Sequence, residues 1–198
     1  NLIGGKNWQP MSYSPQTGLV YLPAFNMCMD IANREEEYTP GKFYLASEFD
    51  LDKAGASGSH LAEFMAWDPV AKKKAWTIEE PNMWAGGAMS TAGGLVFRGD
   101  AAGFLNVYAA KDGQRLARLE VGTSIMAAPM SYAIDGVQYV AVMAGYGGGG
   151  GFAFPPDSAA YQRGNQGRVI AFRLGGGAVP LPPRVPDAPL PPPPSSTA

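Results

Sequence analysis

Short apolar runs separated by turn residues form a pattern that recurs three times along the chain. A Met-Ser step, a turn and a β-branched or aromatic run appear in residues 7–21, 86–97 and 127–140. The second and third copies are about 41 residues apart, a period typical of four-stranded blades in a β-propeller. The first and second copies are about 78 residues apart, so we expect one blade plus an insertion between them.

A second pattern runs in phase with the first. Residues 66–76 align with residues 107–117, and each copy reads as a strand, a tight turn on Asp-Pro or Asp-Gly, and a returning strand. Residues 167–174 repeat the first of these strands alone. Two patterns repeated in register predict an all-β chain of antiparallel four-stranded units, with residues 61–106 and 107–145 as the clearest blades.

Three blades cannot close a propeller, because closed rings need about four to eight. An open arc leaves strand edges and blade faces uncovered. The chain also begins at Asn1, on a segment that already reads as structured. We therefore expect the C-terminal arc, about three to four blades, of a larger propeller. The remainder of the propeller is expected as a missing N-terminal part or as another chain.

Two segments depart from the blade pattern. Residues 25–60 mix methionine, acidic residues and glycine, and we expect a long insertion there, since long ordered insertions often lie over a binding face. The expected propeller part, residues 1–174, ends before a low-complexity tail. Residues 175–198 are rich in proline, which favours an extended polyproline II spacer, and we expect this tail to stay apart from the propeller.

Composition and charge exclude several classes of function. The formal net charge is −2 and charged residues make up 16% of the chain. The sequence has no basic patch of the kind that binds nucleic acid. No apolar run approaches the ~20 residues of a membrane span. Cys28 is the only cysteine; we expect a small buried side chain, with a reactive thiol or an interchain disulfide as alternatives. His60, the only histidine, is expected at the surface or in a capping role.

The spacing of reactive residues shows no catalytic set. Neither a Ser-His-Asp arrangement nor a His-Cys metal cluster is visible. The five glycines at 147–151 lack the Gly-Lys-Ser/Thr end of a phosphate-binding loop.

Tryptophans precede two copies of the Met-Ser pattern, at Trp8 and Trp84. Equivalent strand ends of a propeller meet at one end of the ring, around its central channel. We expect the two indoles to offer a flat apolar surface for a planar ligand there, and Asn7 to donate to a carbonyl or carboxylate. The alternative is that Trp8 and Trp84 only pack between blades.

Three stretches of the chain resemble the pyrroloquinoline-quinone (PQQ)-dependent alcohol dehydrogenases. They are residues 4–24 (GGKNWQPMSYSPQTGLVYLPA), the pair 84–87 (WAGG) and 91–100 (TAGGLVFRGD), and residues 135–142 (DGVQYVAV). The resemblance covers residues 1 to about 174. It implies an eight-bladed propeller in a periplasmic enzyme that passes hydride from an alcohol to PQQ.

The resemblance further implies a calcium or lanthanide ion beside the quinone, a vicinal disulfide next to it, and a catalytic Asp that takes the alcohol proton. The family's ion ligands, base and vicinal cysteines have no match in this chain, and Cys28 is not one of that pair. No catalytic or metal-binding residue is therefore assigned here, and we expect the chain to be inactive in isolation.

Residue by residue, Asn7 and Trp8 fall on the family's cofactor-contacting Asn-Trp, and Trp84 falls in its Trp-x-Gly-Gly segment, over which the ring system lies. Tyr146 stands where many relatives have tryptophan in a Gly-Trp-Gly-Gly segment. The resemblance thus assigns Asn7, Trp8, Trp84 and Tyr146 to cofactor binding. Lys72 replaces a turn glycine that is common in the family's blade repeat.

Two functions stay open at this point. The first is the C-terminal part of a quinoprotein alcohol dehydrogenase that oxidises a small alcohol or aldehyde. A proline-rich linker joins a cytochrome c domain in the quinohaemoprotein branch, so haem c on a separate domain or a cytochrome c electron acceptor is also expected. The second is a non-catalytic propeller that acts as an assembly scaffold. For the enzyme, an apolar substrate approach is predicted from the side chains of Met27, Met29, Phe152 and Phe154.

Overall fold

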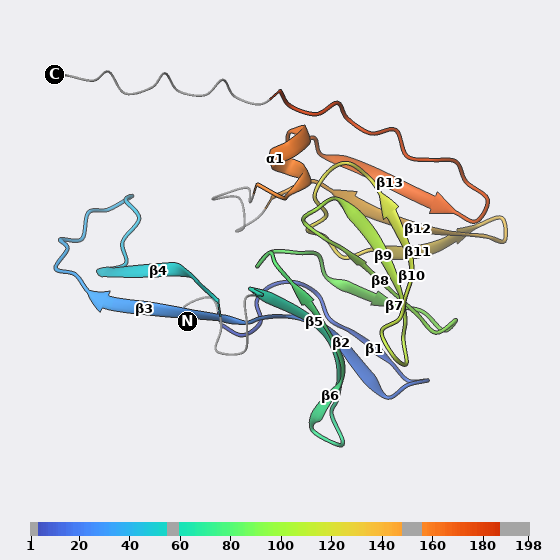
Figure 1. Cartoon of the computed structure of the whole chain (residues 1–198), viewed down its shortest axis with the longest axis horizontal. Helices are drawn as coiled ribbons and strands as arrows, with labels where there is room; N and C mark the ends of the chain where they lie inside the picture. The colour runs from blue at the N-terminus through green and yellow to red at the C-terminus, as the bar shows by residue number, and fades with distance from the viewer. Residues whose placement is uncertain (1–3, 55–59, 148–155, 187–198) are drawn as a thin grey trace, which may run out of the picture.

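The computed structural model describes residues 4–54, 60–147 and 156–186 of the 198-residue chain. Its strands form three antiparallel sheets that follow one another side by side, and a separate two-stranded ribbon (Figure 1). The predicted all-β architecture, an arc of propeller blades, is thereby confirmed. Within the described residues, no helix combines the length and the apolar character needed to cross a bilayer.

The first two sheets have four strands each, in the orders β1-β2-β5-β6 and β10-β9-β8-β7, and the third has the order β11-β12-β13. The strand bounds are Ser12–Ser14 (β1), Leu19–Phe25 (β2), Ala62–Asp68 (β5), Lys73–Glu80 (β6), Ala88–Ser90 (β7), Leu95–Gly99 (β8), Phe104–Ala109 (β9), Arg115–Glu120 (β10), Met130–Ile134 (β11), Val137–Ala144 (β12) and Arg168–Arg173 (β13).

The two repeated patterns mark equivalent places in the sheets. Each Met-Ser step lies at the first strand of a sheet, since Ser12 begins β1, Ser90 ends β7 and Met130 begins β11. The second pattern marks the third strands, β5 and β9, and its shortened last copy is β13, as predicted. The predicted blades 61–106 and 107–145 are wrong, because each range joins strands of two sheets. A period fixes the spacing of units but not where a unit begins.

The turn between the third and fourth strands has the same backbone in two sheets. Gly113 stands in the left-handed region with a φ of 74°, and Lys72, its counterpart in the first sheet, has a φ of 54°. A non-glycine residue pays about 1–2 kcal/mol for this conformation. Lys72 therefore keeps the geometry of the repeat and departs from it only in its side chain.

Apolar side chains fill the interfaces between neighbouring sheets. Between the first and second sheets the cluster includes Tyr21, Phe64 and Tyr108, with Trp76 packed against it. The Tyr21 hydroxyl donates to the Ala110 carbonyl at 2.9 Å, which ties β2 to the second sheet. A second cluster joins the second and third sheets through Leu105, Val121, Ile125, Val142 and Ala144.

The insertion at 25–60 is largely a β-ribbon. Strands β3 (Met27–Asn33) and β4 (Ser47–Ala54) pair antiparallel and project beyond the first sheet (Figure 1). Cys28 on β3 is exposed, so the expectation of a buried thiol is wrong. His60 is buried, contrary to the expected surface place, because its Nε2 lies 2.9 Å from Asn26 Nδ2 and 3.3 Å from Glu63 Oε1.

The proline-rich tail lies against the propeller as far as the structure describes it. Val179 packs on the cluster between the second and third sheets, and Pro182 is buried. The carbonyl of Pro182 accepts from Arg163 Nη1 at 2.7 Å, and the Val185 N–H donates to the Gln162 carbonyl at 2.9 Å. The expectation that the tail stays apart is thus wrong for residues 178–186. The carbonyls of an extended polyproline II segment make no hydrogen bonds within the segment, so arginine side chains can donate to them.

Candidate functional site

The segment that carries Trp84 joins β6 to β7 and is clamped between backbone groups of its neighbours. The Gly86 N–H donates to the Gly99 carbonyl at 3.0 Å. A Cβ on Gly86 would lie 2.7 Å from the Ala127 carbonyl oxygen, and one on Gly87 would lie 2.6 Å from Pro10 Cδ. The two glycines of this motif are therefore required by close packing, and they fix the backbone just after Trp84.

Trp8 and Trp84 lie together, as the equivalence of their positions predicts. Their ring centroids are 6.3 Å apart with an angle of 21° between the planes, and Phe25 meets Trp84 edge-on at 5.1 Å. Offset stacking of this kind contributes about 0.5–1.5 kcal/mol beyond the area it buries. Trp84 is partly buried, whereas Trp8 is 43% exposed and presents an open face.

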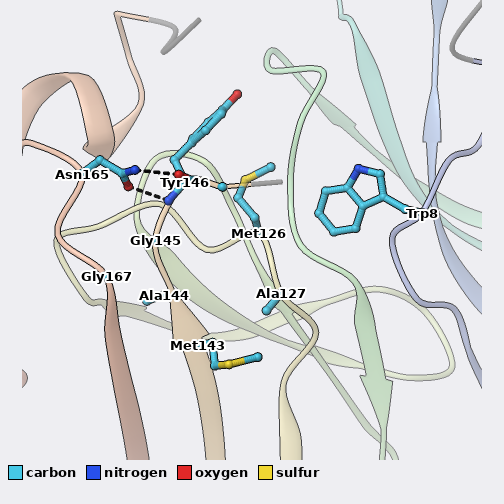
Figure 2. Close-up of a pocket in the computed structure, with 10 residues that line it drawn as sticks. Trp8, Met126, Ala127, Met143, Ala144, Gly145, Tyr146, Asn165 and Gly167 are labelled. Atoms are coloured by element: carbon cyan, nitrogen blue, oxygen red, sulfur yellow. Dashed lines mark hydrogen bonds between the residues drawn. The ribbon is translucent and has the colours of Figure 1, made fainter. Parts of the chain in front are cut away.

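A cleft of about 540 Å³ opens beside Trp8 (Figure 2). Trp8 and Tyr146 lie on opposite sides of it, and Met126 lies between them (Figure 2). Its lining is mostly apolar and comes from four regions of the chain: Trp8, Met126–Ala127, Met143–Gly147, and Asn165 with Gly167. The cleft thus combines a flat indole face with methionine and backbone surfaces, which suits a planar ring.

Tyr146 is fixed mainly through its backbone. Asn165 accepts from the Tyr146 N–H and donates to the Tyr146 carbonyl, both at 2.6 Å (Figure 2). The side chain packs with Ala101, Met126 and Ala160, and Trp84 lies against the same cluster. Burial raises the pKa of Tyr146 to about 12, so its phenol stays neutral at physiological pH.

Asn7 orders the backbone beside Trp8. Its Oδ1 accepts from the Trp8 N–H at 2.8 Å, and its carbonyl accepts from Lys6 Nζ at 2.7 Å. Lys6 Nζ also donates to the Gln9 carbonyl at 2.6 Å. Of the four predicted residues, then, Trp8 and Tyr146 line the cleft, Trp84 stacks behind Trp8, and Asn7 holds the turn that presents Trp8.

Sequence reasoning missed several lining residues. Met126 occupies, one repeat later, the place of Ala85 beside Trp84, so the register of the Met-Ser pattern contains a signal for it. Asn165 lies beyond the short helix α1 (Ala159–Arg163), where no repeat applies. The predicted substrate approach is not reproduced by Met27 and Met29, which lie on β3 and do not line the cleft. Phe152 and Phe154 lie outside the described residues.

Comparison with known proteins identifies the family. The sequence model described as glucose/ethanol/alcohol dehydrogenase, beta-propeller domain, matches residues 58–140. The quinohemoprotein alcohol dehydrogenase of Comamonas testosteroni is 39% identical over 183 residues, which are 88% of this chain and 25% of that protein. The 1-butanol dehydrogenase (cytochrome c) of Thauera butanivorans is 36% identical over 180 residues, 87% of this chain and 26% of that protein. The chain belongs to the PQQ-dependent alcohol dehydrogenase family.

A solved structure agrees with this assignment. The quinohemoprotein alcohol dehydrogenase ADHIIG of Pseudomonas putida HK5 matches with a TM-score of 0.78 at 34% identity, and the match covers 98% of this chain and 30% of that one. The chain spans about a quarter of the length of the curated relatives it matches.

The cleft has the size and the lining of a small-molecule site. Its volume lies within the ~300–1,000 Å³ of typical small-molecule sites, and its aromatic and methionine walls suit a fused ring system. Residues 4–54, 60–147 and 156–186 bring no three His, Cys, Asp or Glu side chains together in a metal-binding group. What these residues offer is an apolar surface with one exposed indole, that of Trp8.

Proposed function

We propose that this chain supplies one wall of the quinone site in a PQQ-dependent alcohol dehydrogenase that oxidises a small alcohol or aldehyde. The observation that carries the proposal is the stacked pair of Trp8 and Trp84 beside a cleft whose other side is Tyr146. PQQ, when bound, supplies the acceptor for the hydride and thus for the two electrons of the substrate.

The proposed roles follow from the contacts of each residue. Trp8 presents its open face to the ring, and Trp84 keeps Trp8 from tilting. Tyr146, neutral and buried, closes the opposite side and excludes water. Asn7 orients Trp8 by accepting from its backbone N–H, and in this proposal the Asn7 amide also donates to a quinone or carboxylate oxygen.

The remaining parts of the reaction belong to the rest of the protein in this proposal. The base that accepts the alcohol proton, and the ligands of a calcium or lanthanide ion, lie outside this chain. A cytochrome c is the proposed electron acceptor, as the name of the Thauera butanivorans relative suggests for that protein. A periplasmic location is part of the same proposal.

The test uses the complete protein that contains this chain, prepared without quinone and titrated with PQQ. Trp8→Ala should weaken PQQ binding about ten- to hundredfold, because a stacking face and its buried area are lost. Asn7→Ala should weaken it about two- to tenfold, the worth of one hydrogen bond. Trp8→Ala should also lower the free energy of unfolding, by at least the ~0.5–1.5 kcal/mol of its stacking on Trp84, so PQQ affinity is measured under conditions where both proteins are folded.

A matched pair of variants separates binding from packing. Trp84→Phe and Trp76→Phe each shorten a partly buried tryptophan in a stacked pair, and Trp76 stacks on Tyr21 and does not line the cleft. Only Trp84→Phe should lower PQQ affinity and dye-linked alcohol oxidation. Equal PQQ affinity in Trp8→Ala, Trp84→Phe and the unaltered protein would contradict the proposal. A complete protein that binds no PQQ would favour the scaffold function instead.

A further inference from the structure

A buried ion pair lies at the base of the loop that carries Trp84. Arg98 on β8 is 2% exposed, and its Nη1 contacts Oε1 of Glu80, the last residue of β6. The desolvation penalty of burying two charges offsets most of their electrostatic attraction, so a buried ion pair is weak evidence for a role in stability. Its position calls for another explanation.

Arg98 also holds the far end of the same loop. Its Nε donates to the Gly86 carbonyl at 3.1 Å, while the Gly86 N–H donates to the carbonyl of the neighbouring Gly99 at 3.0 Å. The guanidinium also makes a cation–π contact with Phe64, since its Cζ lies 4.6 Å from the centroid of that ring. One planar side chain thereby joins the residue before the loop, Glu80, to the residue that ends it, Gly86.

We propose that Arg98 is a positioning residue that closes the 81–85 loop between Glu80 and Gly86 and so sets the Trp84 indole against Trp8. The inference rests on the proposed function in one respect, that the tryptophan pair then holds PQQ. A lysine cannot replace it, because one ammonium lacks the rigid fork that donates in two fixed directions.

The experiment compares Arg98→Lys with Arg118→Lys in the complete protein. Arg118 is the control for the cation–ring contact alone, because its Cζ lies 3.5 Å from the Phe104 ring centroid in the same sheet while the residue is exposed. The first readout needs no cofactor: it is the circular-dichroism couplet of the stacked indoles, defined as the signal lost in Trp84→Phe. Arg98→Lys should remove most of this couplet, and Arg118→Lys should leave it unchanged.

The second readout is PQQ affinity in a double-mutant cycle. Arg98→Lys should weaken PQQ binding about tenfold, a size usual for coupled neighbours, and should have no further effect in the Trp84→Phe background. An unchanged couplet, or equal losses of affinity in both backgrounds, would overturn the inference. If the complete protein binds no PQQ, the proposed function fails and the couplet still decides the role of Arg98.

A further variant guards against misfolding. Glu80→Gln with Arg98→Met removes the connection without leaving a lone buried charge, which is the costly case. This double variant should keep the cooperative unfolding of the protein and lose the indole couplet. A folded double variant with a normal couplet would also overturn the inference.

Discussion

Adding one methyl group at Gly86 should disturb the site without any change of charge or of aromatic side chain. The new Cβ would lie 2.7 Å from the Ala127 carbonyl oxygen, 3.1 Å from that of Ile125 and 3.2 Å from that of Gly99. All three neighbours are backbone, so none can rotate away. Gly86 has no positive φ, so alanine there meets only a steric obstacle.

The distances give the size of the effect. Ordinary van der Waals contact begins near 3.4 Å, so the Gly86→Ala backbone must retreat by about 0.7 Å from the Ala127 oxygen. Moving that far strains the 3.0 Å bond to Gly99 or the 3.1 Å bond from Arg98, and a lost bond costs about 0.5–1.5 kcal/mol. The steric overpacking destabilises the folded protein by a further ~1–3 kcal/mol. Alanine offsets about 0.4–1 kcal/mol of this loss, because it lowers the conformational entropy of the unfolded chain. The expected net loss of unfolding free energy is about 0.5–4 kcal/mol.

The assay measures the free energy of unfolding and PQQ affinity in Gly86→Ala and in its control, Gly93→Ala. Gly93 also lacks a positive φ, and a Cβ there meets nothing closer than Thr91 Oγ1 at 3.7 Å. Gly93→Ala should be neutral or slightly stabilising and should bind PQQ normally. Gly86→Ala should lose both stability and affinity, because Trp84 moves with the backbone. Indistinguishable values for the two variants would refute this account of the clamp.

Two further predictions concern tyrosines. Asn165→Asp keeps an acceptor for the Tyr146 N–H but sets a carboxylate against the Tyr146 carbonyl. Calorimetry should therefore show an unfolding free energy lower by about 1 kcal/mol, and PQQ binding should weaken. The control Gln166→Glu, at an exposed position, should change neither quantity. Burial raises the pKa of Tyr108 and of Tyr146 to about 12, above the ~10 of an unfolded chain, so their contribution to stability is full below pH ~10 and is lost as the pH rises towards 12. Urea unfolding between pH 9 and 11 should therefore show falling stability, and a steeper or equal fall in Tyr108→Phe would contradict this assignment.

Repetition made the sheets predictable. The Met-Ser steps and the Asp-turn pattern repeat because every blade needs the same first strand and the same last turn, and both fell in equivalent places. The match extends to Lys72, whose left-handed φ follows that of Gly113 although the residue type differs. The pairing of Trp8 with Trp84 was predictable for the same reason, since both precede first strands.

Features outside the repeat were not predictable in this way. His60 is buried, and its Nε2 lies beside the side chains of Asn26, 34 residues earlier in the chain, and Glu63. Val179 packs on the apolar cluster between the second and third sheets, and the carbonyls of Pro180 and Pro182 accept from Arg168 of β13 and Arg163 of α1. A proline-rich composition cannot reveal these contacts. The sequence also could not tell which indole faces the cleft, because that depends on the angle between two sheets.

The candidate site depends on contacts between first strands rather than on any one sheet. Ser12 Oγ and Ser90 Oγ lie 2.6 Å apart, and the Ala88 N–H donates to the Pro10 carbonyl at 3.0 Å. These bonds fix β7 against β1 next to the two tryptophans, and the backbone at Ala127 fixes the third sheet against Gly86. A small shift between sheets thus changes the Trp8–Trp84 geometry while each sheet keeps its own ladder. Substitutions at these contacts should affect ligand binding more than equally destabilising substitutions in the outer strands, because only the former change how the sheets meet.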